Sequence, residues 1–163
     1  MLTKDTPASR VRKTNGGASA GKPRVDRANL DGLVGFRMRM AYVAISRRFA
    51  SIMAKLDLTQ KQTGVLWMIG ANGGISQVTL ANELGMDRAS MMAIIDRLAD
   101  RQLLIRERSS SDGRRQELYL TPKGQKVLAQ SRAAVAEHEK WIAECVGKAE
   151  IADLLGLLRR IDR

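Results

Sequence analysis

Two groups of side chains in this chain have the types and spacing needed to contact DNA. A stretch that begins at Asp87 places Met91, Ile95 and Leu98 on one apolar face. The other positions of that stretch, which we expect to face a major groove, are Arg88, Ala89, Ser90, Met92, Ala93 and Asp96 or Arg97. Arginine can bond guanine through two N–H groups, serine can donate or accept, and methionine can lie against a thymine methyl.

The second group lies in a polar loop with an Asp-Gly turn signal, Ser109 to Arg115. Arg114 and Arg115 stand at the tip of this loop, where they could reach a narrow minor groove with its strong negative potential. The alternative is that these arginines are solvated surface charges with no binding role. Their order along a strongly basic chain favours DNA contact.

Helical and strand periodicities predict the elements that position these groups. One long apolar stripe runs through residues 29–56, and Thr59 and Gln62 have the spacing of a capping box for a second helix. Ser76 and Asp87 can cap a third and a fourth helix. Two short strands are expected at 103–108 and 116–120. Thr121-Pro122 then starts a helix that Gly147 ends, and a last helix follows.

This order predicts a mainly α fold with a small β-hairpin, namely a winged helix-turn-helix with N- and C-terminal dimerisation helices. We expect residues 1–25 to form a disordered basic tail and residues 26–163 to form the domain. Within it, the winged helix-turn-helix spans about 57–121, and the dimerisation helices span about 29–56 and 122–162. The last helix is apolar on more than one face, which indicates a dimer interface.

Composition excludes several classes of protein. The chain has 163 residues, 28 Lys+Arg against 17 Asp+Glu and a net charge of +11, which points toward nucleic acid. It lacks an apolar run long enough for a membrane span and a hydrophobic segment typical of a secretory signal, so we expect a cytoplasmic protein. One cysteine and one histidine cannot build an internal disulfide or a zinc site, so we expect no metal and no cofactor.

Four separated motifs resemble the MarR family of bacterial transcription regulators. They are Leu80 to Arg88, Ile94 to Leu98, Asp112-Gly113-Arg114 and Leu120 to Gly124. The resemblance implies an obligate homodimer on a pseudo-palindromic operator, usually a repressor released by a small phenolic or anionic aromatic ligand. It also implies that the helix from Asp87 is the recognition helix and that Arg114 enters the minor groove, oriented by Asp112.

The sequence departs from the family pattern in three places. Ala89, Met92 and Ala93 replace groove-facing residues that are often Ser, Thr or Arg, so DNA shape should contribute more to specificity. Gln102 stands where glycine is common, which requires left-handed strain or a different turn. Ser109 replaces a common acidic residue and leaves the loop tip more positive.

The family logic places an effector pocket where the first, second and fifth helices converge. The candidate lining residues are Arg37, Met40, Tyr42, Trp67, Met68, His138 and Trp141. An arginine among aromatic and thioether groups suits an aromatic carboxylate, and further arginines on the first helix leave room for its coenzyme A thioester. Taken singly, the tryptophans and Met68 are more readily explained as residues that fill the core.

The sequence also has to be compared with an enzyme and with a non-specific nucleic-acid-binding protein. An enzyme is excluded because no phosphate-binding glycine loop and no nucleophile–base set are present. A non-specific architectural DNA- or RNA-binding protein fits the charge, yet the chain has few aromatics for stacking on single strands. We also expect Cys145 to be buried and inert on the apolar side of its helix, rather than a redox sensor.

Overall fold

The computed structural model describes residues 27–109 and 116–161. The chain divides into two compact units between Arg37 and Met38. The described part of the first unit holds a short 3₁₀ helix, η1 (Ala28–Gly32), and the start of α1. There the Arg37 Nε donates to the Asp31 carbonyl at 2.7 Å, and its guanidinium lies 3.5 Å from the Asp31 carboxylate.

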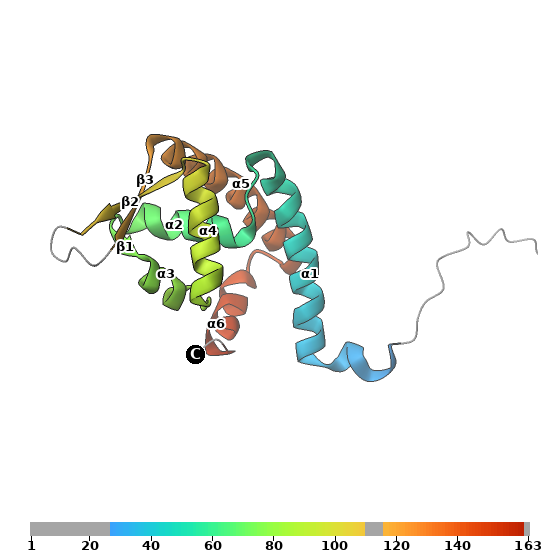
Figure 1. The fold of residues 1–163 in the computed structure, drawn as a ribbon. Helices are drawn as coiled ribbons and strands as arrows, with labels where there is room; N and C mark the ends of the chain where they lie inside the picture. Colours follow the sequence, from blue (N-terminus) through green and yellow to red (C-terminus); the bar gives the residue numbers. More distant parts are fainter. Residues whose placement is uncertain (1–26, 110–115, 162–163) are drawn as a thin grey trace, which may run out of the picture. The chain divides into compact units, whose positions relative to one another are not determined.

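The second unit contains the elements expected of a winged helix-turn-helix, followed by the two C-terminal helices (Figure 1). After η1, the elements run in this order: α1 (Val34–Met53), η2 (Ala54–Leu56), α2 (Gln60–Ala71), β1 (Ile75–Ser76), α3 (Gln77–Glu83), α4 (Arg88–Asp100), β2 (Leu104–Arg108), β3 (Gln116–Leu120), α5 (Pro122–Val146) and α6 (Ile151–Ile161). The mainly α fold class with a small sheet is confirmed.

Side-chain caps set where the helices begin, as the sequence predicted. Thr59 and Gln62 form the full capping box, with the Gln62 amide 3.2 Å from the Thr59 hydroxyl and the Thr59 amide 2.8 Å from the Gln62 Oε1. Ser76 accepts from the Thr79 amide, and Thr121 accepts from the Gly124 amide. Because each cap satisfies amides that have no partner within the helix, helix starts are well determined by the local sequence.

The first predicted helix is wrong as one uninterrupted element. Residues 29–56 form η1, α1 and η2 instead, with Leu33 in an extended conformation between η1 and α1. At the far end, Asp57 adopts a left-handed conformation with φ 48°, which stops η2. An apolar stripe continues smoothly through such breaks, so periodicity alone did not detect them.

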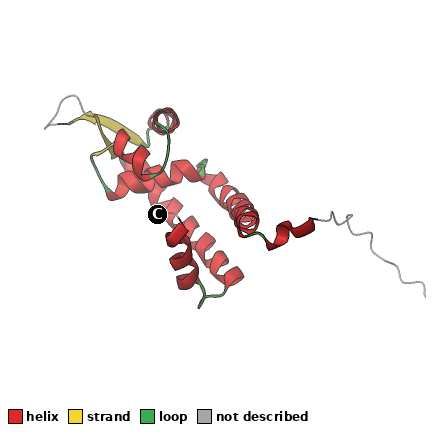
Figure 2. Cartoon of the chain, turned by 90° about the horizontal axis from the view of Figure 1, so that it is seen from below, coloured by secondary structure: helices red, strands yellow, loops and turns green. Residues whose placement is uncertain are grey.

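The sheet has one strand more than the predicted hairpin. Its order is β1-β3-β2, with both pairings antiparallel, and β2 and β3 form a long narrow ribbon (Figure 2). β1 has two residues, too few for an alternating pattern to be recognised in the sequence. Gln102, just before β2, has φ 59°, so the left-handed turn considered from the sequence is present.

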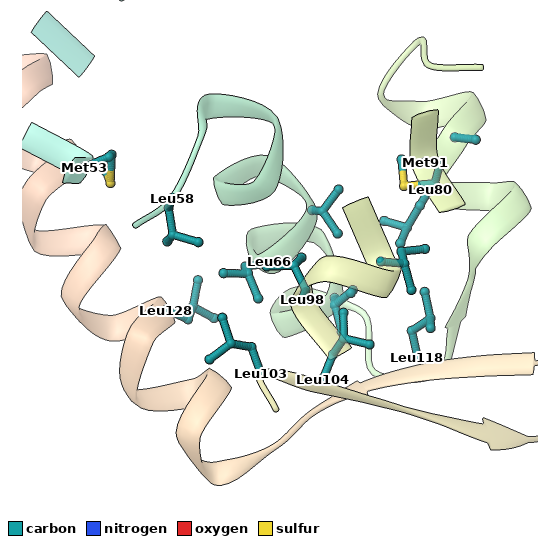
Figure 3. Close-up of a cluster of buried hydrophobic side chains, with 14 of the residues drawn as sticks. Met53, Leu58, Leu66, Leu80, Met91, Leu98, Leu103, Leu104, Leu118 and Leu128 are labelled. Carbon is teal, nitrogen blue, oxygen red and sulfur yellow. The ribbon is translucent and has the colours of Figure 1, made fainter. Parts of the chain in front are cut away.

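The core of the second unit is aliphatic and gathers around α2. Met53, Leu66, Leu80, Met91, Ile95 and Leu98 are fully buried, and Leu103, Leu104 and Leu118 from the sheet region complete the cluster (Figure 3). This packing fixes α4 through one face only, so its opposite face is left to solvent.

Two helices of the second unit expose large apolar side chains to solvent. On α1 these are Met38, Met40, Tyr42 and Val43, and on α6 they are Leu155, Leu157, Leu158 and Ile161. α6 has no buried residue in the single chain. None of the described helices is long and apolar enough to cross a membrane.

Candidate nucleic-acid interface

Helix α4 separates cleanly into a core face and a solvent face. Met91, Ile95 and Leu98 have 0% exposure and hold the helix against α2 and α3. Arg88, Ala89, Met92, Ala93 and Arg97 are exposed, and Ser90 is half-buried. The residues that the sequence assigned to a groove therefore lie off the core face, where a helix can be inserted into a major groove.

The start of α4 is fixed by Asp87. Its carboxylate accepts from the Ser90 amide at 2.8 Å. Hydrogen bonds from the Ser90 side chain and backbone lower the pKa of Asp87, so the carboxylate stays ionised at neutral pH. A negative cap beside the positive end of the helix dipole orders the first turn, which carries Arg88 and Ala89.

Arg106 of β2 forms an ion pair with Asp96 on the solvent side of α4. Asp96 is therefore occupied in holding the strand rather than available to accept from cytosine. Tyr119 of β3 donates to the Glu117 carboxylate at 2.8 Å, and this bond raises the pKa of Tyr119. Asp112, Arg114 and Arg115 lie outside the described residues.

Sequence reasoning did not single out Arg101, which follows the last residue of α4. Its guanidinium donates to the backbone carbonyls of Leu56, at 2.9 Å, and of Asp57. The Arg101 carbonyl in turn accepts from Lys123 Nζ at 2.8 Å. The sequence carries no signal for this contact, because the partners are backbone atoms 44 and 45 residues away.

An open cavity of about 390 Å³ lies among α1, the first turns of α2 and the turn between α3 and α4. Tyr42, Gln60 and Lys61 supply a phenol, an amide and an ammonium group, and Leu84 and Met86 supply apolar surface. Asp87 lines the same cavity and also caps α4. A bound molecule here would contact the start of α4 directly.

The residues predicted to bind an effector lie in several separate places. Tyr42 lines this cavity. Trp67 donates to the Ser131 hydroxyl at 3.2 Å and lies under the Arg132 guanidinium, and Met68 packs on the core. Met40 is exposed on α1, and Arg37 belongs to the first unit, where Asp31 holds it.

His138 and Trp141 are brought together on α5. Their rings stack at 5.8 Å, His138 meets the edge of Phe49 at 5.5 Å, and the Arg48 guanidinium lies 4.8 Å from the Trp141 ring centre. His138 is 2% exposed, and neither ring nitrogen has a hydrogen-bond partner within the described residues. Burial lowers its pKa, and the Arg48 charge acts in the same direction while Glu139 opposes it. His138 is therefore neutral at pH 7.

Cys145 is exposed on α5, which corrects the prediction that it is buried. It lies in the last turn before Gly147, where Glu144 and Val146 are exposed as well, so the apolar stripe of α5 does not enclose the thiol. Over residues 27–109 and 116–161, no group of three His, Cys, Asp or Glu side chains could hold a metal ion.

Comparisons with known proteins agree on one family. The model described as "MarR family" matches residues 56–115. A protein of Thauera aromatica, whose name assigns it to regulation of the hcr operon, is 32% identical over 83% of this chain and 82% of its own.

Solved structures give the same result. The transcriptional repressor CouR bound to a 23-mer DNA duplex is similar with a TM-score of 0.82 and 34% identity, covering 86% of this chain and 99% of CouR. CouR bound to p-coumaroyl-CoA has a TM-score of 0.79 and 32% identity over the same shares of both chains.

Proposed function

Since the chain belongs to the MarR family of DNA-binding transcription regulators, which are not enzymes, we propose that it is a dimeric repressor released by an aromatic carboxylate or its coenzyme A thioester. Each protomer would place α4 in the major groove of one half of a pseudo-palindromic operator. The observation that carries this proposal is the division of α4 into a buried face and a capped, exposed face that carries Arg88 and Arg97.

Few side chains of α4 are available to contact bases. Arg88, in the first turn of α4, can bond guanine through two N–H groups, and Ser90 and Met92 can contact neighbouring bases. Ala89 and Ala93 have no hydrogen-bonding groups and allow the helix to approach closely. Arg97, together with Arg114 and Arg115 of the loop, adds phosphate and minor-groove contacts, with Asp112 orienting Arg114.

Dimerisation would cover the apolar surfaces of α1 and α6. Four large side chains on α6, Leu155, Leu157, Leu158 and Ile161, are between 39% and 63% exposed in the single chain. Such a patch favours a self-complementary interface with twofold symmetry. Twofold symmetry would set the two recognition helices about one DNA turn apart, ~34 Å.

The effector proposal places the ligand in the cavity next to Asp87. Its volume of about 390 Å³ suits an aromatic acyl group. Lys61 would neutralise a carboxylate or hydrogen-bond a thioester oxygen, while Tyr42, Leu84 and Met86 would pack on the ring. The phosphates of coenzyme A would remain outside, near exposed arginines of α1 such as Arg39 and Arg47. CouR, which binds p-coumaroyl-CoA, supports the thioester form of the proposal.

Release would follow from the double role of Asp87. A ligand that fills the cavity contacts the Met86–Asp87 turn, and a displaced Asp87 would no longer hold the Ser90 amide. The first turn of α4 would then lose its order together with Arg88. His138 and Trp141 lie in a second cluster with Phe49 and Arg48, which we propose as a support between α1 and α5 rather than as a ligand contact.

Fluorescence polarisation on the DNA that flanks the protein's own gene tests the proposal. The titration includes scrambled competitor and is repeated with a panel of free aromatic acids and their coenzyme A thioesters. We expect binding that prefers one site and is reversed by one compound. Equal binding to scrambled DNA that no compound changes would support a non-specific architectural protein instead.

Matched variants locate the effector. Lys61→Met removes the ammonium group from the cavity and keeps most of the side chain, so the active compound should release DNA only at higher concentration. Lys55→Met removes another exposed charge, from η2 and outside the cavity, and should leave the release curve unchanged. Equal responses of the two variants would place the effector elsewhere.

A further inference from the structure

We propose that Arg101 is a positioning residue that fixes the recognition helix relative to the end of α1, and so sets the operator spacing that the dimer accepts. This inference rests on the proposed function, because it assumes a dimer that reads two half-sites. It adds a residue that neither the family pattern quoted above nor the apolar periodicity singles out.

Arg101 connects α4 to the end of α1, and the proposed mode of DNA binding requires these two elements to move together. Arg101 is the residue at which α4 ends, and its two terminal nitrogens reach the carbonyls of Leu56 and Asp57. Those carbonyls lie where η2 continues α1 and then stops, so they have no further helical turn to supply donors. Arg101 therefore caps the C-terminal end of the α1–η2 segment with a cation, which the helix dipole favours.

The same residue is held from a third direction. Lys123, in the first turn of α5, donates to the Arg101 carbonyl, and the Thr121 hydroxyl donates to the Gln102 carbonyl at 2.7 Å. The end of α4 is thus bonded both to the segment that follows α1 and to the start of α5. The start of α4, by contrast, is bonded within its own first turn through Asp87.

The chemistry of the contact favours a positioning role over simple attraction. A guanidinium is planar and presents its N–H groups in a rigid fork, so two carbonyl acceptors on consecutive residues define its plane and its direction. The Arg101 side chain is 27% exposed, whereas the Asp57 carboxylate, 3.7 Å away, is 92% exposed. An ion pair with so exposed a carboxylate contributes little, so the carbonyl bonds carry the geometry.

A fixed angle between α1 and α4 has a measurable consequence in a dimer. When α1 belongs to the interface, the angle determines the separation and the rotation of the two recognition helices. Changing the half-site spacing by one base pair moves one half-site by ~3.4 Å and rotates it by roughly a tenth of a turn. A rigid dimer discriminates against such a change, and a dimer with a loosened hinge tolerates it.

The test measures Kd on a palindromic operator, selected from a random duplex library with the full-length protein, and on versions with one base pair inserted or removed at the centre. We expect the unchanged protein to lose about tenfold or more in affinity on the altered spacings. Arg101→Gln should reduce that ratio to about threefold or less. Arg101→Lys can bond one carbonyl but not both, so it should give an intermediate ratio. This variant replaces Arg101→Gln in the test if the glutamine variant does not fold.

Asp57→Asn is the matched control. Asparagine tolerates the left-handed conformation and keeps both carbonyl acceptors, so the spacing ratio should equal that of the unchanged protein. If Arg101→Gln weakens binding by the same factor on every spacing, only a charge has been lost and the inference is overturned. An unchanged protein that shows no spacing preference would instead overturn the proposed function.

Discussion

Arg106 of β2 and Asp96 of α4 form an ion pair that ties this strand to the solvent side of the helix. The two residues belong to elements that would enter adjacent grooves of one DNA half-site. Their side chains are 31% and 51% exposed, so solvent screens the pair. The pair therefore serves to orient the strand more than to stabilise the fold.

Breaking this pair should affect DNA binding more than stability. For Arg106→Gln and Asp96→Asn we expect a coupling free energy in unfolding of at most about 1 kcal/mol in a double-mutant cycle. Affinity for the operator should fall several-fold in each variant, because the wing is no longer held against α4. Urea unfolding and polarisation titrations measure the two effects. A large loss of stability with unchanged DNA affinity would contradict this assignment.

Gly124 lies where α5 packs against the end of the α4–β2 turn. A Cβ at this position would lie 1.8 Å from the Leu103 carbonyl oxygen, which is a backbone atom and cannot rotate away. We expect Gly124→Ala to lower the free energy of unfolding by roughly 1–3 kcal/mol. In Gly64→Ala the new methyl would lie 3.9 Å from Leu84 Cδ2, so α2 should be unaffected or stabilised by up to about 1 kcal/mol. Similar changes in the free energy of unfolding of the two variants would contradict the close approach of Gly124 to the Leu103 carbonyl.

His138 should make the protein less stable in mild acid. Its pKa in the folded state is lowered from 6.5 by burial, while the unfolded chain titrates near that ordinary value. Between the two pKa values the unfolded state binds more protons than the folded state. The free energy of unfolding therefore keeps its whole His138 contribution above about pH 6.5 and decreases as the pH falls toward the folded pKa. Thermal unfolding between pH 7.5 and 5.5 measures this loss.

The control is unambiguous because the chain contains one histidine. His138→Leu removes the titrating ring and keeps an apolar side chain between Phe49 and Trp141, so its stability should change less over the same pH range. An identical pH profile for both proteins would mean that His138 is not buried in a neutral form.

Leu158 of α6 tests the dimer. It is 39% exposed in the single chain, and we propose that the partner protomer covers it. Leu158→Glu should shift the mass measured by light scattering from twice the 18.0 kDa of the chain toward one chain. Val78→Glu places the same charge at a residue of α3 that is 48% exposed and lies outside the proposed interface, so this variant should remain dimeric. Monomerisation by both substitutions would indicate misfolding.

Local signals in the sequence predicted the elements well. The Thr59, Ser76, Asp87 and Thr121 caps bond the amides that their spacing implied, because capping depends on residues three positions apart. The buried face of α4 follows from helical periodicity alone. Features that depend on distant backbone atoms were beyond such reasoning, and the Arg101 bonds to Leu56 and Asp57 are the clearest example.

The lining of the cavity was harder to predict for the same reason. Aromatic and methionine side chains on converging helices can line a cavity or fill the core, and sequence cannot distinguish the two. Tyr42 faces the cavity, whereas His138 is enclosed by Phe49 and Trp141. Tyr42 is the one lining residue that was predicted to bind an effector. The others, which include Lys61, Met86 and Asp87, come from the start of α2 and from the turn between α3 and α4. Asp87 was identified from the sequence, but only as a cap.

Arg88→Ala tests most directly whether the exposed face of α4 reads bases. The measurement is the ratio of Kd on scrambled DNA to Kd on the operator, at one fixed salt concentration. We expect the variant to lose roughly 1–3 kcal/mol of this discrimination while its affinity for scrambled DNA changes little. An Arg88→Ala protein that keeps the full ratio would contradict the claim that α4 is the recognition helix.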